Sequence, residues 1–144
     1  MTPEETAMRA TKIMWESDTA SKWAGMTLGP VGPGRAEVAM TLTPDQCNGH
    51  GTAHGGVLYM LAGSAFAMAI NSYNIRAVAQ SGTITYLAPA HVADHLTATA
   101  REVTKAGRTG LYDVEIANQN AEIIAQFRGT SRTIGGPLFE PASM

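Results

Sequence analysis

A stretch without a single charged residue, Gly55 to Ile75, constrains the fold of this chain more than any other feature. Its first part, Val57 to Ile70, is apolar and has the length of a helix. A helix that is hydrophobic all round is buried by other elements, so the rest of the chain has to surround it. We therefore expect a central helix over about residues 55–72.

The same stretch is too short to span a membrane, because glycine and serine at positions 63 and 64 interrupt it and a bilayer requires about 20 apolar residues. The first residues of the chain are acidic, so no export signal is predicted. Cys47 is the only cysteine, which fits a reducing cytoplasm, and the net charge of −2 argues against nucleic-acid binding. These features predict a cytoplasmic protein with neither a membrane nor a nucleic acid as partner.

The rest of the chain is expected to form one further helix and a series of strands. Thr2, Pro3 and Glu5 form a capping signature that predicts a helix from Pro3 to Ser17, within residues 1–18. Glycines and prolines make residues 23–34 a predicted loop with at most a short extended piece. Alternating or β-branched patterns predict strands at Arg35–Thr43, Ala77–Leu87, a segment beginning near Leu96, Leu111–Ala117 and Glu122–Arg132.

Short connections between the later strands imply an antiparallel sheet, with turns at residues 105–110 and 118–120. Because one helix is apolar all round, we expect a sheet of about five to six strands to curl around it. We therefore expect an α+β protein with one domain over residues 1–144. Residues 135–144 show no periodicity and are expected to form a loose tail.

The junction before the central helix is the strongest candidate for a binding site. Residues Asn48 to Gly56 read Asn-Gly-His-Gly-Thr-Ala-His-Gly-Gly and lead directly into the apolar segment. The first amides of a helix have no partner within the helix, and glycine lets a ligand approach them closely. Two structural alternatives remain: the glycines form only a tight turn, and Asn48 only caps its loop through an Asx-turn.

Several short motifs, in this order and at this spacing, resemble the hotdog fold and, within it, the thioesterases of the phenylacetic-acid-degradation type. They are Asn48 with His54-Gly55-Gly56, Leu61-Ala62, Ala65-Phe66-Ala67, Ile84 to Leu87 before Pro89-Ala90, Gly107-Arg108-Thr109, and Tyr112-Asp113-Val114. The resemblance implies hydrolysis of acyl-CoA thioesters, commonly aryl-acetyl or medium-chain ones, without a cofactor other than the coenzyme A of the substrate. It also implies a homodimer with one continuous sheet, often paired again into a homotetramer.

Thioester hydrolysis passes through a tetrahedral oxyanion, which is stabilised by N–H donors held in place beforehand. The amides of Gly55 and Gly56 suit that role, because a helix N-terminus also carries partial positive charge. The carboxamide of Asn48 can position the water or the thioester carbonyl.

The histidines of the junction admit two roles. His50 or His54 could act as a general base, but neither has acidic or cysteine partners spaced as a metal site. We expect the ring of His54 to bond the backbone and support the loop without transferring a proton. His91 and His95 are expected at the surface.

Gly63 is the main departure from the family pattern. By the resemblance, a catalytic aspartate stands at this position after Leu61-Ala62 and acts across the dimer interface on an acyl group held by the partner's glycines. Position 63 lies seven residues after Gly56, and therefore on nearly the same face of the helix. Glycine offers no side chain there, and it weakens a helix by about 0.5–1 kcal/mol relative to alanine.

Three interpretations of Gly63 compete. In the one we favour, the aspartate has been replaced, which leaves a binding site with reduced or no turnover. In the second, Ser64 acts as nucleophile, although no base is visible beside it and its hydroxyl is expected to bond to its own helix backbone. In the third, the space at Gly63 admits a bulkier acyl group, and Asn48 or His54 activates the water.

Basic residues near a glycine turn are candidates for the phosphates of coenzyme A. They are Lys105, Arg108 and Arg132, and the alternative is that they are solvated surface cations. The resemblance adds the strand after the central helix, where Ser81, Gly82, Thr83 and Thr85 would line the pantetheine channel.

Two other functions remain as alternatives. A hotdog hydratase would use an Asp and a His, and Asp45 and His50 have the spacing but not the neighbouring residues of that motif. A non-catalytic acyl-CoA binding protein is favoured by Gly63, and it would bind the ligand without releasing product.

Overall fold

The computed structural model describes residues 1–141. Helices and strands follow one another along the chain as α1 (Pro3–Glu16), α2 (Thr19–Trp23), β1 (Thr27–Gly32), β2 (Arg35–Thr41), the short 3-10 helix η1 (Pro44–Gln46), α3 (Gly55–Ile70), β3 (Ala77–Tyr86), β4 (His95–Ala106), β5 (Thr109–Ala117) and β6 (Ile123–Thr133). None of the helices in this part of the chain is long and apolar enough to cross a membrane.

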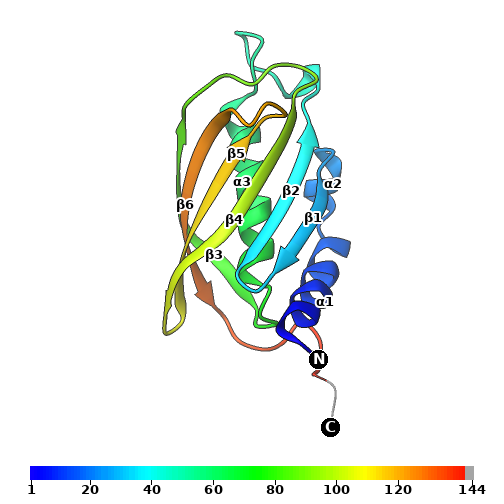
Figure 1. Cartoon of the computed structure of the whole chain (residues 1–144), viewed down its shortest axis with the longest axis vertical. Helices are drawn as coiled ribbons and strands as arrows, with labels where there is room; N and C mark the ends of the chain where they lie inside the picture. The colour runs from blue at the N-terminus through cyan, green and yellow to red at the C-terminus, as the bar shows by residue number, and fades with distance from the viewer. Residues whose placement is uncertain (142–144) are drawn as a thin grey trace.

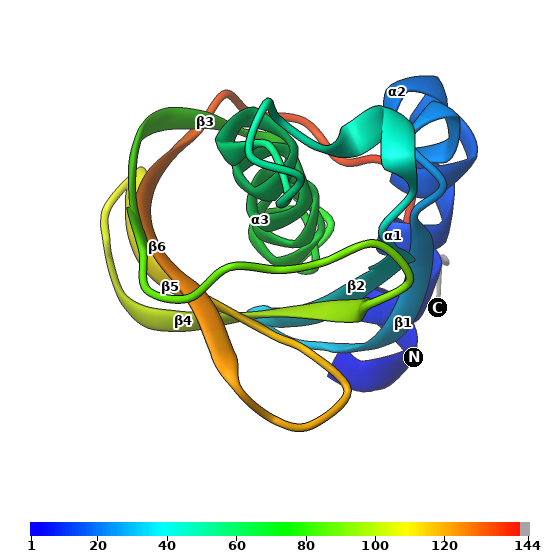
Figure 2. The same cartoon turned by 90° about the horizontal axis from the view of Figure 1, so that it is seen from above.

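One antiparallel sheet curves around α3 (Figures 1 and 2). Its six strands lie in the order β1-β2-β4-β5-β6-β3. β3 follows α3 in the chain and lies at the edge, where Ala77 pairs with Thr133 and Tyr86 with Ala125 of β6. The predicted α+β class, with an antiparallel sheet wrapped around a central helix, is confirmed.

The core lies between α3 and the concave face of the sheet. Leu61, Ala62 and Ala65 of α3 are fully buried, and the ring of Phe66 packs edge-on against Tyr112 of β5. The helix is not covered all round, however, because Tyr59 is 41% exposed and Gly56 is also exposed. The absence of charge in α3 thus reflects burial on one side and an uncovered apolar strip on the other.

The N-terminal helix begins as the sequence predicts. The Thr2 hydroxyl accepts a hydrogen bond from the Glu5 N–H at 3.1 Å, Pro3 occupies the first turn, and Ser17 is the C-cap. The segment expected as a loop with a short extended piece contains the strand β1, and α2 ends at its first residue, Trp23. β1 tolerates Pro30 because it is an edge strand with an irregular register between Leu28 and Val31, and an edge position does not need every N–H.

The residues after β6 form neither helix nor strand as far as Pro141, yet they are not loose. The Asn74 side chain accepts hydrogen bonds from the Leu138 and Phe139 N–H groups and donates one to the Phe139 carbonyl. The Arg9 guanidinium stacks over the Phe139 ring at 4.3 Å. The last three residues of the expected tail, 142–144, lie outside the described residues.

Candidate functional site

The loop before α3 is organised by the side chain of Asn48. Its Oδ1 accepts hydrogen bonds from the His50 N–H at 2.9 Å and from the Thr52 N–H and hydroxyl at 3.3 Å each. The Asx-turn considered for Asn48 is therefore present. It occupies only the oxygen, and within residues 1–141 the Nδ2 group has no hydrogen-bond partner, so it remains a donor for a ligand.

His54 and the two glycines divide the roles differently from the sequence-based expectation. The Gly56 N–H donates to the His54 Nδ1 at 2.8 Å, so the Gly56 amide is already occupied. The Gly55 N–H, at the first helical position, has no acceptor among the described residues. Of the two amides that we expected to bind an oxyanion, only that of Gly55 is therefore unpaired, while the His54 ring bonds the backbone as expected.

The tautomer of His54 follows from the same contact. A neutral imidazole whose Nδ1 accepts a hydrogen bond carries its proton on Nε2. The free nitrogen of His54 is therefore a donor, and the ring has no available lone pair with which to act as a general base.

Asn48 and Gly55, which carry the unpaired amides, line a common cavity of about 480 Å³. Its walls come from the loop, the start of α3 and the segment after β3, namely Thr52, Ala53, Leu58, Tyr86, Leu87, Ala88, Pro89 and Ala90. The Tyr86 hydroxyl donates to the Gly55 carbonyl at 2.8 Å. Tyr86 belongs to one of the motifs that resemble the family, but no pattern in the sequence marked it as a site residue.

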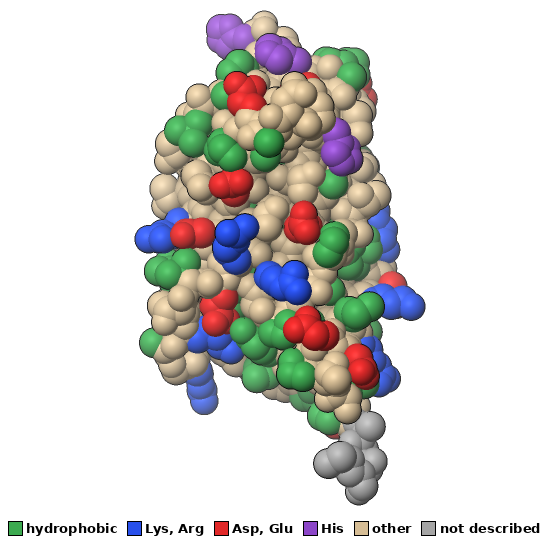
Figure 3. Space-filling model, in the orientation of Figure 1, with side chains coloured by type: hydrophobic (Ala, Val, Ile, Leu, Met, Phe, Trp, Pro, Cys, Tyr) green, Lys and Arg blue, Asp and Glu red, His purple; other side chains and the backbone are tan. Residues whose placement is uncertain are grey.

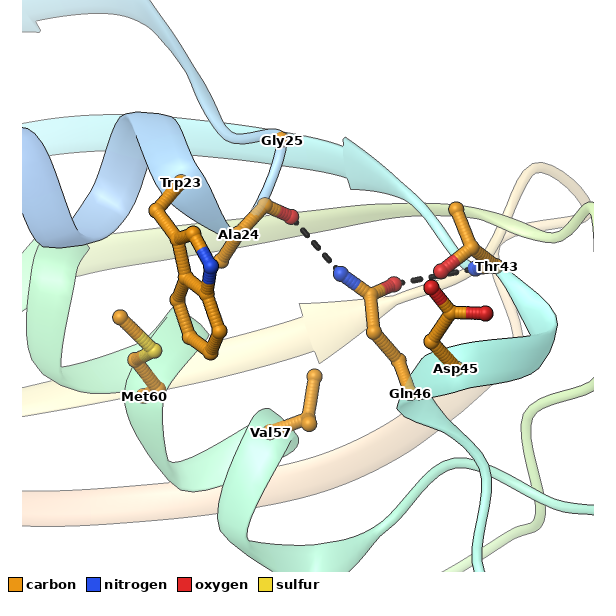
Figure 4. A pocket seen from close by; sticks show the side chains of 8 residues that line it. All are labelled: Trp23, Ala24, Gly25, Thr43, Asp45, Gln46, Val57 and Met60. Atoms are coloured by element: carbon orange, nitrogen blue, oxygen red, sulfur yellow. Dashed lines mark hydrogen bonds between the residues drawn. The ribbon is translucent and has the colours of Figure 1, made fainter.

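A second cavity, of about 340 Å³, lies on another face of the first turns of α3 (Figure 4). Trp23, which is 85% exposed, stands over it, and Val57 and Met60 of α3 lie below. The Gln46 side chain ties its wall together, donating to the Ala24 carbonyl at 2.8 Å and accepting from the Thr43 N–H at 3.0 Å. No local pattern in the sequence predicts this cavity, because its walls come from three separate segments.

Gly63 lies on the uncovered side of α3. A Cβ atom at this position would meet no heavy atom within 4 Å, so a side chain has room there. Eight residues separate Gly63 from Gly55, which corresponds to about 12 Å along the helix axis. A carboxylate at position 63 therefore could not reach a carbonyl bound to the Gly55 amide of the same chain.

The Ser64 side chain is buried and takes part in the contact between α2 and α3. Its hydroxyl lies 2.7 Å from the Ser21 hydroxyl, which donates to the Asp18 carboxylate at 2.7 Å. Our expectation that Ser64 bonds to its own helix backbone is wrong, because its hydroxyl contacts a side chain of another helix, α2. Ser64 does not line the cavity that contains Asn48 and Gly55.

The residues predicted to bind coenzyme A do not lie at this cavity. Arg132 pairs with Thr109 at the start of β5, next to the β4–β5 hairpin that carries Lys105 and Arg108, and this hairpin lies at the end of the molecule where α3 finishes (Figure 1). On the face shown in Figure 3, the Lys and Arg side chains lie over the middle and lower parts, whereas His side chains gather at the upper end.

The predicted residues of β3 point to two sides of the sheet. A Cβ atom at Gly82 would meet Tyr59 of α3, so this position faces the helix. Ser81, Thr83 and Thr85 alternate with it and face outward; the Ser81 hydroxyl lies 2.6 Å from that of Thr130. One chain therefore does not bring the predicted pantetheine residues together with the oxyanion donors.

The hydratase interpretation has no support from the geometry. Asp45 lines the cavity of Figure 4, whereas His50 is exposed on the loop and lines neither of the two cavities. His91 and His95 are exposed, as predicted. Within residues 1–141, no three His, Cys, Asp or Glu side chains cluster as they would around a metal ion.

Comparison with known proteins is consistent with this architecture. The family model of the thioesterase superfamily matches residues 50–125. The chain is 44% identical over 125 residues to the acyl-coenzyme A thioesterase PaaI of Escherichia coli (strain K12), covering 87% of this chain and 89% of that protein. The structure of E. coli PaaI, from the phenylacetic acid degradation operon, superposes with a TM-score of 0.92 at 41% identity, covering 94% of this chain and 99% of the other.

A variant of the phenylacetic acid degradation protein PaaI from Thermus thermophilus is also similar. Its structure superposes with a TM-score of 0.78 at 38% identity, covering 81% of this chain and all of that one (100%). The sheet wrapped around α3 is thus the hotdog fold, and the chain belongs to the thioesterase superfamily.

Proposed function

We propose that this protein binds acyl-CoA thioesters and hydrolyses them to the free acid and coenzyme A. The observation that carries this proposal is that Gly55 and Asn48, each with an unpaired N–H donor, line one cavity at the N-terminus of α3. Donors fixed in this way stabilise the oxyanion of acyl transfer. Membership of the thioesterase superfamily, and a relative named as an acyl-coenzyme A thioesterase, support the same reaction.

The acyl group we propose is phenylacetyl or a related aryl or medium-chain group. Support comes from the similarity to PaaI proteins of phenylacetic acid degradation. A role in phenylacetate degradation in the cytoplasm agrees with this assignment and with the unpaired Cys47.

We propose further that turnover is slow with glycine at position 63. Hydrolysis needs a group that activates water, and by resemblance a carboxylate would stand here. His54 cannot replace the carboxylate as a base, because its free nitrogen is a hydrogen-bond donor. The Ser64 hydroxyl is hydrogen-bonded to the Ser21 hydroxyl. A non-catalytic acyl-CoA binding protein remains the second candidate, and it rests on the same residue.

A second copy of the chain is needed to complete the site. Within one chain, the three parts of the candidate site are far apart. The Gly55 amide lies at the start of α3, position 63 in its middle, and the Lys105–Arg108 hairpin beyond its end. In the described part of the chain, β3 pairs only with β6, which leaves its other edge open. Antiparallel pairing of two β3 strands would extend the sheet and place the hairpin end of one chain beside the oxyanion donors of its partner. We propose this homodimer, paired again into a tetramer.

The test is release of coenzyme A from phenylacetyl-CoA, followed with a thiol reagent, for the unchanged chain and for Gly63→Asp. The open space at Gly63 lets the new side chain fit, so we expect the rate to rise by orders of magnitude, with Gly63→Asn as an uncharged control that gives no rise. Rapid release by the unchanged chain would overturn the role given to Gly63. If Gly63→Asp produces no gain although acyl-CoA binds, the binding-protein alternative holds.

A further inference from the structure

Tyr86 lies where the end of β3 meets the first turn of α3. We propose that it is a positioning residue, which holds the Gly55–Gly56 peptide so that the Gly55 N–H stays directed into the cavity shared with Asn48. This inference rests on the proposed function, because it concerns the donor that would bind the thioester carbonyl.

The Gly55–Gly56 peptide is held at both of its polar atoms. The Tyr86 hydroxyl donates to its carbonyl oxygen at 2.8 Å, and its N–H donates to the His54 Nδ1, also at 2.8 Å. Two successive glycines are the most flexible backbone a chain can offer. These two side chains therefore restrict the plane of the peptide, and with it the orientation of the neighbouring Gly55 N–H.

The glycines are what allow both side chains to approach. A Cβ atom at Gly55 would lie 2.8 Å from the Tyr86 Oη and 2.9 Å from its Cζ, closer than a real Cβ contact. A Cβ atom at Gly56 would lie 3.0 Å from the His54 Nδ1. The glycine pair thus serves the contacts of Tyr86 and His54 as well as the approach of a ligand.

Packing of the core does not explain the position of Tyr86. Its side chain is 51% exposed and lines the cavity with Asn48 and Gly55. Its hydroxyl donates to the Gly55 carbonyl. In an α-helix such a carbonyl already accepts the N–H of the residue four positions later, so the helix does not need the bond from Tyr86. A hydrogen bond to the carbonyl polarises the peptide and strengthens the bond that its N–H makes to His54.

The test uses two unreactive analogues of phenylacetyl-CoA and the complete chain. In the ketone analogue, methylene replaces the thioester sulfur and the carbonyl remains; in the thioether analogue, methylene replaces the carbonyl. Both share the coenzyme A end and the phenyl ring, so the ratio of their Kd values reports the carbonyl contact alone. Calorimetry measures this ratio without turnover, whatever residue stands at position 63.

Tyr86→Phe should weaken ketone binding by about 3- to 10-fold and leave thioether binding unchanged, as expected for one hydrogen bond. Gly55→Ala serves if Tyr86→Phe unfolds: it keeps the amide, but its Cβ displaces the Tyr86 hydroxyl at the wall of the cavity, so ketone binding should weaken more than thioether binding. Tyr73→Phe is the matched control, because it removes a 2.8 Å hydroxyl hydrogen bond, to Glu102, near the other end of α3; the ratio should not change.

If Tyr86→Phe leaves the ratio of the two Kd values unchanged, whether neither analogue or both analogues lose affinity, the positioning role is overturned and the proposed function stays intact. If the unchanged chain binds neither analogue, the proposed function itself fails and the inference fails with it.

Discussion

Ser64 follows Gly63 directly, yet its hydroxyl belongs to a different part of the molecule. Because Ser21 gives its proton to the Asp18 carboxylate, Ser64 must be the donor in the 2.7 Å contact between the two serines. The three side chains thus connect α2 to α3. No signal in the sequence pairs these serines, which are 43 residues apart.

Ser64→Ala should lower the free energy of unfolding by about 1 kcal/mol, the usual contribution of one hydrogen bond. In a Gly63→Asp background it should leave the rate of phenylacetyl-CoA hydrolysis unchanged, because Ser64 lies outside the cavity of Gly55. Urea unfolding and the thiol assay check the two parts. An acyl group found on Ser64 by mass spectrometry would contradict this account.

The ion pair of Asp113 and Arg128 on the outer face of the sheet predicts a pH dependence. The Arg128 guanidinium bonds both carboxylate oxygens, at 2.7 and 2.8 Å, and holds the pKa of Asp113 below its usual value of 3.8. A lowered pKa means that the pair stabilises the fold above about pH 3.8 and ceases to do so as the pH falls through the lowered value.

Asp113→Asn should therefore lower the urea midpoint at pH 7, and the difference from the unchanged chain should shrink in acid. Glu115→Gln is the control, since Glu115 lies on the same strand and forms no ion pair within residues 1–141. A difference that persists unchanged below the pKa of Asp113 would contradict the ion-pair explanation.

At the scale of elements, local signals predicted what depends on neighbouring residues. The cap at Thr2 and the apolar length of α3 were sufficient for two helices. β1 was expected only as a short extended piece, because Gly29 and Pro30 are tolerated only at an edge and the position of a strand in a sheet is not a local property. Which amide is free at the start of α3 depends on the nitrogen that His54 presents, and no sequence pattern encodes this.

The glycine inside α3 gives a stability prediction for that helix. Because a Cβ atom at position 63 meets nothing within 4 Å, Gly63→Ala should raise the free energy of unfolding by about 0.5–1 kcal/mol through helix propensity alone. Gly82→Ala is the contrasting variant, since its Cβ would lie 2.8 Å from the Phe127 ring and should destabilise. Urea unfolding measures both, and a loss of stability in Gly63→Ala would show that the space at position 63 is filled.

At the scale of the whole molecule, the parts of the candidate site are spread along the length of α3. The donors lie at its start, position 63 in its middle and the cationic hairpin beyond its end. Helix spacing gives the separation of Gly55 and position 63, but the place of the hairpin depends on the path of the strands, which the sequence did not predict. Our central proposal is that two copies of the chain form each site, one supplying the donors and the other position 63, where glycine stands in place of a carboxylate.

Mixing two inactive chains tests this claim most directly. One is the unchanged chain, which keeps Gly55 but lacks a carboxylate at position 63; the other carries Gly63→Asp together with Gly55→Val, whose side chain collides with Tyr86 at the wall of the cavity. Circular dichroism and light scattering first establish that both fold and associate. After subunit exchange, we expect phenylacetyl-CoA hydrolysis at roughly a quarter of the Gly63→Asp rate, because half of the dimers are mixed and each has one complete site. No hydrolysis in the exchanged mixture, although Gly63→Asp alone is active, would contradict the shared site.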